Sequence, residues 1–346
     1  MRREAPQLSL GAIFSTIIMS WIEISLNTNH EAVDWVCTLL AKEILQEDFH
    51  IVEYVGYSDD NDQDNEVWAF TMLIYLPEDL QIHRRVEAIA NILKPLHRTG
   101  MTSELQTFVI ATKPTLQTNS SYPNALIRRI GDRFVIVTDN SDYVPCNDQE
   151  IILRLKNSLA FGSGLHPATI LSLQLLERHV QPESQALDLG SGSGILSGAI
   201  AKLGANVLAI DNDPVAVTAT KETMQLNQIT RVKVMQASLG SASQLGHWMG
   251  GDHIKAVPAI AAARQFDLIV ANIFARVHIS LAAEFAKALR LNSGILITAG
   301  YTYDRAEDVV TAMLAVGFYE CDRVQIDEWV AIAFCDNLSN ILPSQI

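Results

Sequence analysis

Several features that mark particular protein classes are scarce in this sequence. Only four of its 346 residues are cysteine, and Cys37, Cys146, Cys321 and Cys335 are scattered without a C-x-x-C pair. This spacing argues against a disulfide framework or a zinc module and indicates reduced thiols. Basic residues number 25 against 39 acidic ones, which gives a formal net charge of -14. That balance argues against a general nucleic-acid binder and favours a basic partner.

The N-terminal apolar stretch, residues 8–19, is too short to span a bilayer. It follows two arginines as in a weak signal peptide, but no small-residue cleavage site follows it cleanly. We expect residues 1–19 to be a non-native extension from an upstream start codon. The hydrophobic content of 49% over 346 residues is ample for about two packed domains. We expect a cytoplasmic protein that does not associate with membranes.

Residues 20–112 alternate between strand and helix patterns, with Asn29 as a candidate helix cap. The expected order is strand 21–26, helix 29–40, strand 51–55, strand 67–75, helix 80–96 and strand 104–111. This order predicts an N-terminal α+β ferredoxin-like domain over residues 20–112. The acidic stretch 58–66 lacks the glycine and terminal glutamate of an EF-hand loop, so we interpret it as a solvated hairpin tip. A polar linker with two prolines is expected at 113–132.

The most informative stretch is residues 186–214. A short apolar strand ends at Asp188, and a turn with Gly190, Gly192 and Gly194 leads into a helical pattern. A second apolar strand then ends at Asp211. This is a strand–loop–helix–strand unit of a parallel sheet, whose glycine loop lets a ligand approach the backbone. Asp211 falls about 20 residues after the loop, where a carboxylate accepts hydrogen bonds from ribose hydroxyls.

The spacing of the loop glycines identifies the class of nucleotide ligand. A dinucleotide fingerprint reads G-x-G-x-x-G, whereas Ile195 stands where its third glycine would fall. Asp188 places a carboxylate before the loop, which suits the cationic amino-acid end of a ligand better than a pyrophosphate. The pattern is typical of class I S-adenosylmethionine methyltransferases. We therefore predict an α/β domain with a Rossmann-like, mostly parallel sheet over residues 133–336, and no metal site.

Two further stretches belong to the predicted site. Residues 160–169 form a glycine-containing loop with His166 and Thr169, followed by a helix that begins near Pro167. The spacing fits His166 as a general base, and equally as a capping or packing residue. Asn272 follows an apolar strand at 268–270, and ligands bind at the carboxyl edge of parallel sheets. This position favours a functional role for Asn272 over that of a turn or capping residue.

The motifs, taken in order, resemble those of the ribosomal protein L11 methyltransferase family. The matching segments are A-F-G-S-G-L-H-P-A-T, L-D-L-G-S-G-S-G-I-L, D-N-D-P, V-A-N-I and E-W-V-A. The resemblance covers nearly the whole chain, from about residue 21 to residue 334. It implies a substrate-recognition domain at 20–112, a linker at 113–132 and a methyltransferase domain at 133–336. It also implies methyl transfer from S-adenosylmethionine to lysine and N-terminal amino groups of ribosomal protein L11, free or in the large subunit. We expect a monomer, although the motifs do not encode the oligomeric state.

By motif position, the resemblance implies cofactor contacts at Thr169, Gly190, Asp211 and Asn272. Asp188 and Gly192 belong to the same predicted cofactor site, and we expect Asn272 also to orient the amine during catalysis. The sequence departs from the family pattern at Ser163, Leu165, Ala168 and Ser191, and residues 238–265 are longer than usual. These departures affect the prediction of the protein substrate more than the prediction of the cofactor.

Two other functions remain compatible with these motifs. One is methylation of a different protein, or of a small molecule, by the same cofactor chemistry. The other is a non-catalytic S-adenosylmethionine-binding protein that assists ribosome assembly. The N-terminal domain favours a protein substrate over a small one. The methylated amino groups and the number of methyl groups added are not encoded in the motifs.

Overall fold

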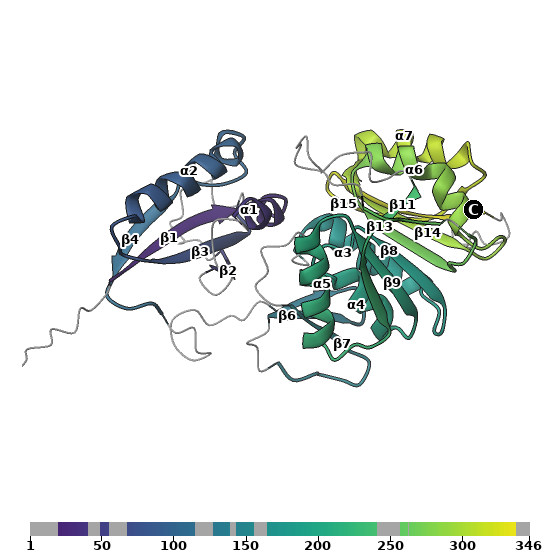
Figure 1. The fold of residues 1–346 in the computed structure, drawn as a ribbon, viewed down its shortest axis with the longest axis horizontal. Helices are drawn as coiled ribbons and strands as arrows, with labels where there is room; N and C mark the ends of the chain where they lie inside the picture. Colours follow the sequence, from purple (N-terminus) through teal and green to yellow (C-terminus); the bar gives the residue numbers. More distant parts are fainter. Residues whose placement is uncertain are drawn as a thin grey trace, which may run out of the picture.

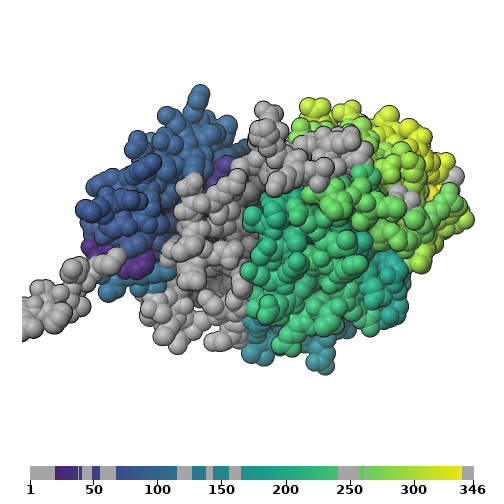
Figure 2. Space-filling model, in the orientation of Figure 1, coloured from purple at the N-terminus to yellow at the C-terminus, as the bar shows by residue number. Residues whose placement is uncertain are grey.

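The computed structural model describes residues 20–40, 49–54, 68–114, 127–138, 143–155, 165–240, 257–261 and 263–336. The N-terminal stretch 1–19, the acidic stretch 58–66, loop residues 160–164 with Ser163 and most of the insertion at 238–265 lie outside these residues. Figure 1 shows an N-terminal region in purple and blue beside a larger region in teal to yellow. In the space-filling view the described residues of the N-terminal region lie on the left and those of the larger region on the right (Figure 2).

The N-terminal region is one antiparallel sheet in the order β2-β3-β1-β4. Its elements are β1 (Trp21–Thr28), α1 (Ala32–Leu40), β2 (Phe49–Glu53), β3 (Phe70–Pro77), α2 (Ile82–Arg98) and β4 (Gln106–Ile110). Along β1 the buried side chains alternate, which directs Ile24 and Leu26 into the core. Val33 of α1 and Ile89 of α2 pack into the same core. This order and pairing are those of a ferredoxin-like split motif.

Local signals in the sequence explain where these elements begin. Asn29 Oδ1 accepts a hydrogen bond from the Ala32 amide at 2.8 Å, so Asn29 caps α1 as predicted. Asp79 Oδ1 accepts from the Gln81 amide at 2.9 Å just before α2. The helices and strands start and end within a few residues of the predicted positions, because these caps and the apolar alternation are local properties.

A small sheet connects to the larger region. It has the order β5-β6-β7 and consists of β5 (Ile127–Ile130), β6 (Phe134–Thr138) and β7 (Ile151–Leu155). Phe134 and Leu153 pack in one core with Leu171 of the following helix. Strand β5 falls inside the range predicted as a linker, and it pairs with β6. Residues 127–130 therefore belong structurally with the larger region.

The main sheet has the order β10-β9-β8-β13-β14-β16-β15. Its strands are β8 (Gln185–Leu189), β9 (Asn206–Asp211), β10 (Val232–Gln236), β13 (Leu268–Asn272), β14 (Ile295–Thr302), β15 (Tyr319–Ile326) and β16 (Trp329–Cys335). Five neighbouring strands run parallel, and β16 runs antiparallel between β14 and β15. The mostly parallel sheet predicted for residues 133–336 is confirmed. The two-residue strands β11 (Ser238–Leu239) and β12 (Ala259–Ile260) pair separately.

Helices cover both faces of the main sheet (Figure 1). One layer holds α3 (Pro167–His179), α4 (Ile195–Lys202) and α5 (Pro214–Leu226), and the other holds α6 (Ala275–Ala288) and α7 (Tyr303–Leu314). The sheet and its two helix layers enclose two apolar cores. One core lies between the sheet and the helices α3 and α4, and the other lies between the sheet and the helices α6 and α7. Among the described helices, none is both long and apolar enough to cross a membrane.

The strand order reverses between β8 and β13. The chain passes from β8 to β9, its neighbour on one side. The neighbour of β8 on the other side is β13, which comes later in the chain. In open parallel sheets the crevice outside the carboxyl ends of two such strands is the usual ligand site. The glycine loop follows β8 and Asn272 ends β13, so the fold places both predicted segments at this crevice.

Candidate active site

The turn after β8 lies at the carboxyl edge of the main sheet. Because it is rich in glycine, it presents backbone atoms there with few side chains. Gly190 and Gly194 have φ angles of 78° and 83°, in the region that favours glycine. A Cβ atom on Gly194 would lie 2.9 Å from Thr220 Cα, and one on Gly190 would lie 2.8 Å from Ile273 Cγ2. The loop therefore packs closely against α5 and against the residue after β13. Helix α4 begins directly after the loop, which places its first amide groups at this edge.

Asp211 ends β9 beside the glycine loop, as predicted. Its Oδ2 accepts a hydrogen bond from the Gly192 amide at 3.0 Å, and its Oδ1 accepts from the Asp213 amide at 2.9 Å. Asp213 in turn caps α5 by accepting from the Val215 amide at 2.8 Å. The Asp211 carboxylate is thus fixed in orientation by two backbone donors. Each of its oxygens has a second lone pair that can accept from a ligand hydroxyl.

Asp188, the carboxylate predicted to face the site, is buried. Its side chain is 0% exposed, and its Oδ2 accepts a hydrogen bond from Ser197 Oγ at 2.5 Å. Burial, and to a smaller extent the nearby Asp211, raise the pKa of Asp188 to about 7. Its Oδ1 has no hydrogen-bond partner among the described residues. Asp188 is therefore a buried acceptor that a nearby cation would return to the charged form.

Thr169 and Asn272 meet across the crevice, although 103 residues separate them in the chain. Asn272 Nδ2 donates a hydrogen bond to Thr169 Oγ1 at 3.3 Å. Thr169 lies in the first turn of α3 and is 0% exposed. The buried Oδ1 of Asn272 has no hydrogen-bond partner among the described residues. The contact brings together the two stretches that the sequence placed at the site.

His166 acts as a helix cap. Its Nδ1 accepts a hydrogen bond from the Ala168 amide at 3.1 Å, and its ring stands edge-on to Trp329 at 4.3 Å between centroids. The side chain is 1% exposed. Burial, and to a smaller extent His30, lower the pKa of His166 to about 4. Of its two candidate roles, the geometry favours the capping one.

Comparisons with known proteins agree with this geometry. Residues 20–336 match the family model of the ribosomal protein L11 methyltransferase (PrmA) family. The ribosomal protein L11 methyltransferase of Chloroflexus aurantiacus is 38% identical over 326 residues, which cover 90% of this chain and 97% of that protein. The chain belongs to this family. The corresponding protein of Herpetosiphon aurantiacus is 36% identical over 322 residues, covering 90% of this chain and 98% of that protein.

A solved structure within the family supports the same conclusion for the fold. The ribosomal protein L11 methylase of Lactobacillus delbrueckii subsp. bulgaricus has a TM-score of 0.50 and 30% sequence identity. The match covers 60% of this chain and 97% of that one. The class I methyltransferase fold predicted from the glycine loop is thereby confirmed.

S-adenosylmethionine is the methyl donor of this methyltransferase family, and the residues present fit it. The glycine loop offers backbone without side chains, which suits close approach of a nucleoside. The unpartnered oxygens of Asp188 and Asn272 are buried acceptors at the same crevice, and such groups carry a free-energy penalty unless a ligand or water pairs with them. Asp211 presents further acceptor capacity at the end of β9.

Several residues that support the loop were not recognised in the sequence. Thr220 Oγ1 donates to the Gly192 carbonyl at 3.0 Å, and Thr223 Oγ1 donates to the Ser193 carbonyl at 2.7 Å. Ser191 Oγ and Thr220 Oγ1 lie 2.9 Å apart. The available signal was the threonine pair at i, i+3 in α5, which places two hydroxyl groups on one buried helix face.

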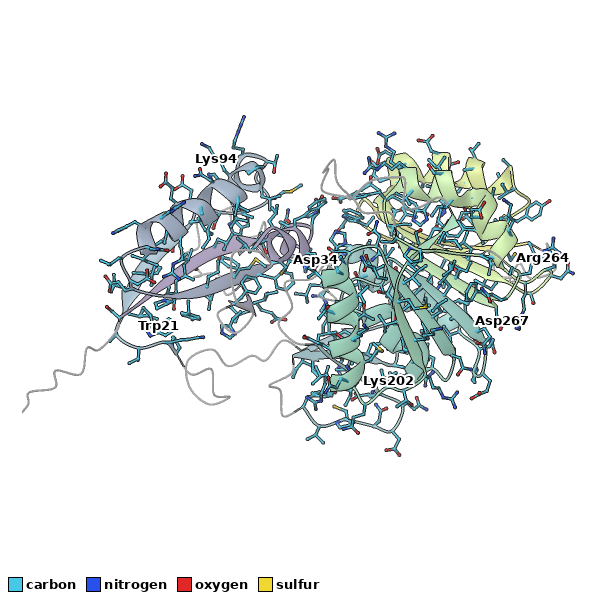
Figure 3. The ribbon with its side chains drawn as sticks, in the orientation of Figure 1. Trp21, Asp34, Lys94, Lys202, Arg264 and Asp267 are labelled. Atoms are coloured by element: carbon cyan, nitrogen blue, oxygen red, sulfur yellow. The ribbon has the colours of Figure 1, made fainter. Side chains whose placement is uncertain are left out.

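The N-terminal region contacts the crevice through α1. The Trp35 ring lies 6.3 Å from the Phe274 ring, two residues after Asn272, with an interplanar angle of 30°. Leu165, next to His166, is fully buried in the core of the N-terminal region. Figure 3 labels Asp34 at the end of that region nearest the larger one, and Lys94 away from it. The β1–α1 end of the first region is therefore the part nearest to Asn272.

A cavity of about 540 Å³ lies elsewhere, at the amino ends of β8, β13 and β14. Its lining includes Arg178, Ser184, Asp267 and Asn292. Ligands of parallel sheets bind at the carboxyl ends, so this cavity is not the methyl-transfer site. Within the described ranges, no three His, Cys, Asp or Glu side chains gather as metal ligands would.

Proposed function

We propose that this protein transfers methyl groups from S-adenosylmethionine to lysine side-chain and N-terminal amino groups of ribosomal protein L11. The supporting observation is the family match over residues 20–336, which includes the N-terminal region as well as the methyltransferase fold. A match to the methyltransferase fold alone would be compatible with many substrates. A match that also includes the N-terminal region favours the substrate of the family.

The proposed cofactor contacts are Thr169, Gly190, Gly192, Asp211, Asn272 and Asp188. Asp211 accepts hydrogen bonds from the ribose hydroxyls, a role supported by its fixed carboxylate beside the loop. Asp188 pairs with the cationic amino-acid end, which is supported by its buried, unpartnered Oδ1. Gly190 and Gly192 offer backbone to the nucleoside.

In the proposed mechanism, the protein mainly positions the amine. The bound cofactor supplies a methyl group already activated on its sulfonium. Asn272 Oδ1 accepts an N–H hydrogen bond from the incoming neutral amine, while Thr169 holds the other end of the carboxamide. The closed crevice desolvates the amine, which lowers its pKa and favours the neutral form. Asn272 would hold the amine with its lone pair toward the methyl group of a bound cofactor, and such positioning supplies most of the rate. S-adenosylhomocysteine would then be the leaving group, and the methylated amine would release its proton to water.

We propose that the N-terminal region recognises the protein substrate. The proposed domains are recognition at 20–112, a linker at 113–132 and methyltransferase at 133–336, with β5 (residues 127–130) packing with the last of these. Trp35 approaches the Asn272 segment through Phe274, so α1 lies where a substrate side chain would enter. We expect the protein to act as a cytoplasmic monomer on L11, either free or in the large subunit, without reading nucleic acid or binding membranes.

The experiment that tests this function combines the purified protein, isotopically labelled S-adenosylmethionine and purified L11. We expect label on L11, located by peptide mass spectrometry at lysines or at the N-terminus. Free lysine and an unrelated lysine-rich protein are the controls, and neither should be labelled at a comparable rate. Absence of label on L11, with cofactor binding intact, would contradict the proposed function.

A further inference from the structure

His278 is a fully buried histidine in α6 that the sequence motifs did not single out. Its Nε2 lies 3.0 Å from the carbonyl oxygen of Ala299 in β14. A carbonyl can only accept, so Nε2 carries the proton and donates. Burial outweighs nearby carbonyl groups and lowers the pKa of His278 to about 4, so the ring is neutral at neutral pH. Its Nδ1 makes no hydrogen bond within the described residues.

The Ala299 carbonyl accepts a second hydrogen bond from the segment that carries the proposed catalytic group. The Ile273 amide donates to it at 3.0 Å, directly after Asn272. Asn272 is also the register partner of Ala299 between β13 and β14. One backbone oxygen of β14 thus accepts hydrogen bonds from the residue after β13 and from helix α6.

Gly300 of β14 lies close to the end of β13. Its φ angle is 90°, and a Cβ atom there would lie 2.7 Å from the Ile273 carbonyl oxygen and 2.8 Å from Asn272 Oδ1. The register of β14 shifts between Thr298 and Tyr301, whose side-chain oxygens lie 2.6 Å apart. The Tyr301 ring stands edge-on to His278 at 5.5 Å between centroids. His278 therefore packs against the segment of β14 whose register is irregular, and Gly300 of this segment lies next to Asn272 Oδ1.

We propose that His278 is a positioning residue for methyl transfer, which holds the Ala299 carbonyl and through it the Asn272 carboxamide. This inference rests on the proposed role of Asn272. Among the described residues, the Asn272 side chain itself makes one hydrogen bond, a long contact of 3.3 Å to Thr169. Its orientation therefore depends on the backbone at residues 272–273. His278 supplies a hydrogen bond from the helix layer that keeps this backbone in place.

The test compares His278→Leu with His278→Gln, which keeps a side-chain N–H donor. Leu281→Val is the matched control, because Leu281 is also fully buried in α6 and packs in the core on that face of the sheet. We expect His278→Leu to lower kcat on L11 by roughly tenfold or more, as small misplacements of reacting groups do. The dissociation constant for S-adenosylmethionine should change far less. His278→Gln should recover part of kcat, and Leu281→Val should leave kcat near the original value.

Two further readouts separate positioning from general destabilisation. Amide hydrogen exchange in a peptide covering residues 268–275 should be faster in His278→Leu than in Leu281→Val, because the Ile273 amide loses a fixed acceptor. In an Asn272→Ala background, His278→Leu should cause little additional loss of kcat, since both act through one group. Additive losses, or unchanged exchange and kcat with only a lower melting temperature, would overturn the inference. Failure of the unmodified protein to methylate L11 would instead overturn the proposed function.

Discussion

Around Asp211 and the glycine loop, side-chain and backbone groups are joined by hydrogen bonds of 2.7–3.0 Å. Among the described residues, the Asn272 side chain instead makes one hydrogen bond, of 3.3 Å, to the side chain of Thr169. We call these the Asp211 half and the Asn272 half of the site. The Asp211 half comes from one continuous stretch and the helix after it. The Asn272 half is assembled from α3, β13 and β14 and touches the N-terminal region through Phe274.

We expect this difference to correspond to two functions, cofactor binding and methyl transfer to the substrate. The donors and acceptors of the Asp211 half are fixed, which suits a small cofactor that makes the same contacts in every turnover. In the Asn272 half, the orientation of the side chain depends on the surrounding elements. This half can therefore respond to a protein substrate that docks on the neighbouring N-terminal region. Changes in the Asp211 half should therefore weaken cofactor binding. Changes in the Asn272 half, or in the N-terminal region, should reduce methyl transfer.

The largest expected effect comes from removing the N-terminal region. A chain starting at residue 122 keeps all proposed cofactor contacts but lacks the proposed recognition domain. We expect methylation of intact L11 to be abolished while the dissociation constant for S-adenosylmethionine is nearly unchanged. Calorimetry of cofactor binding serves as the control that the remaining domain is folded. Full-rate methylation of L11 by this shortened chain would show that recognition lies elsewhere.

The second effect concerns the Asp211 half alone. Asp211→Ala removes the proposed ribose acceptor and the anchor of the Gly192 amide. We expect S-adenosylmethionine binding to weaken by about 1–3 kcal/mol, as for lost hydrogen bonds to a charged group. Isothermal calorimetry measures this change directly. Unchanged affinity would remove Asp211 from the cofactor site.

A smaller effect is expected from pH. The folded-state pKa of Asp188 is raised to about 7, above its ordinary 3.8, so the carboxyl group takes up a proton as pH falls through 7. Pairing with a cationic cofactor requires the charged form. S-adenosylmethionine affinity should therefore fall as pH is lowered from 7 to 5.5, by at most about tenfold per unit. Asp188→Asn should show a weak, nearly pH-independent affinity, and a pH dependence that survives this substitution would have another source.

The Asp211 half was largely predictable from the sequence, because its signals are local. Strand, glycine turn, helix and acid follow one another in the chain, and each has its own pattern of residues. The Asn272 half was only partly predictable. The position of Asn272 after a strand was visible, but its contact with Thr169 depends on packing between distant elements. The shared carbonyl of Ala299 depends on the packing of β13 and α6 against β14, which the apolar pattern at 294–299 did not indicate.

Burial explains the remaining differences. His166 was compatible with two roles because spacing does not report exposure, and the enclosed ring with its lowered pKa favours capping. Asp188 was expected to face the site as a carboxylate; its side chain is fully buried, and Ser197 donates a hydrogen bond to one of its oxygens. Both outcomes depend on neighbours from other parts of the chain.

The separation of the two halves is tested most directly by Asn272→Ala, with kcat on L11 and the S-adenosylmethionine dissociation constant measured on the same preparation. Asn272 is proposed to orient the amine as well as to contact the cofactor. We predict a loss in kcat that clearly exceeds the loss in cofactor affinity. Equal losses in both quantities would contradict the account and assign Asn272 to cofactor binding alone.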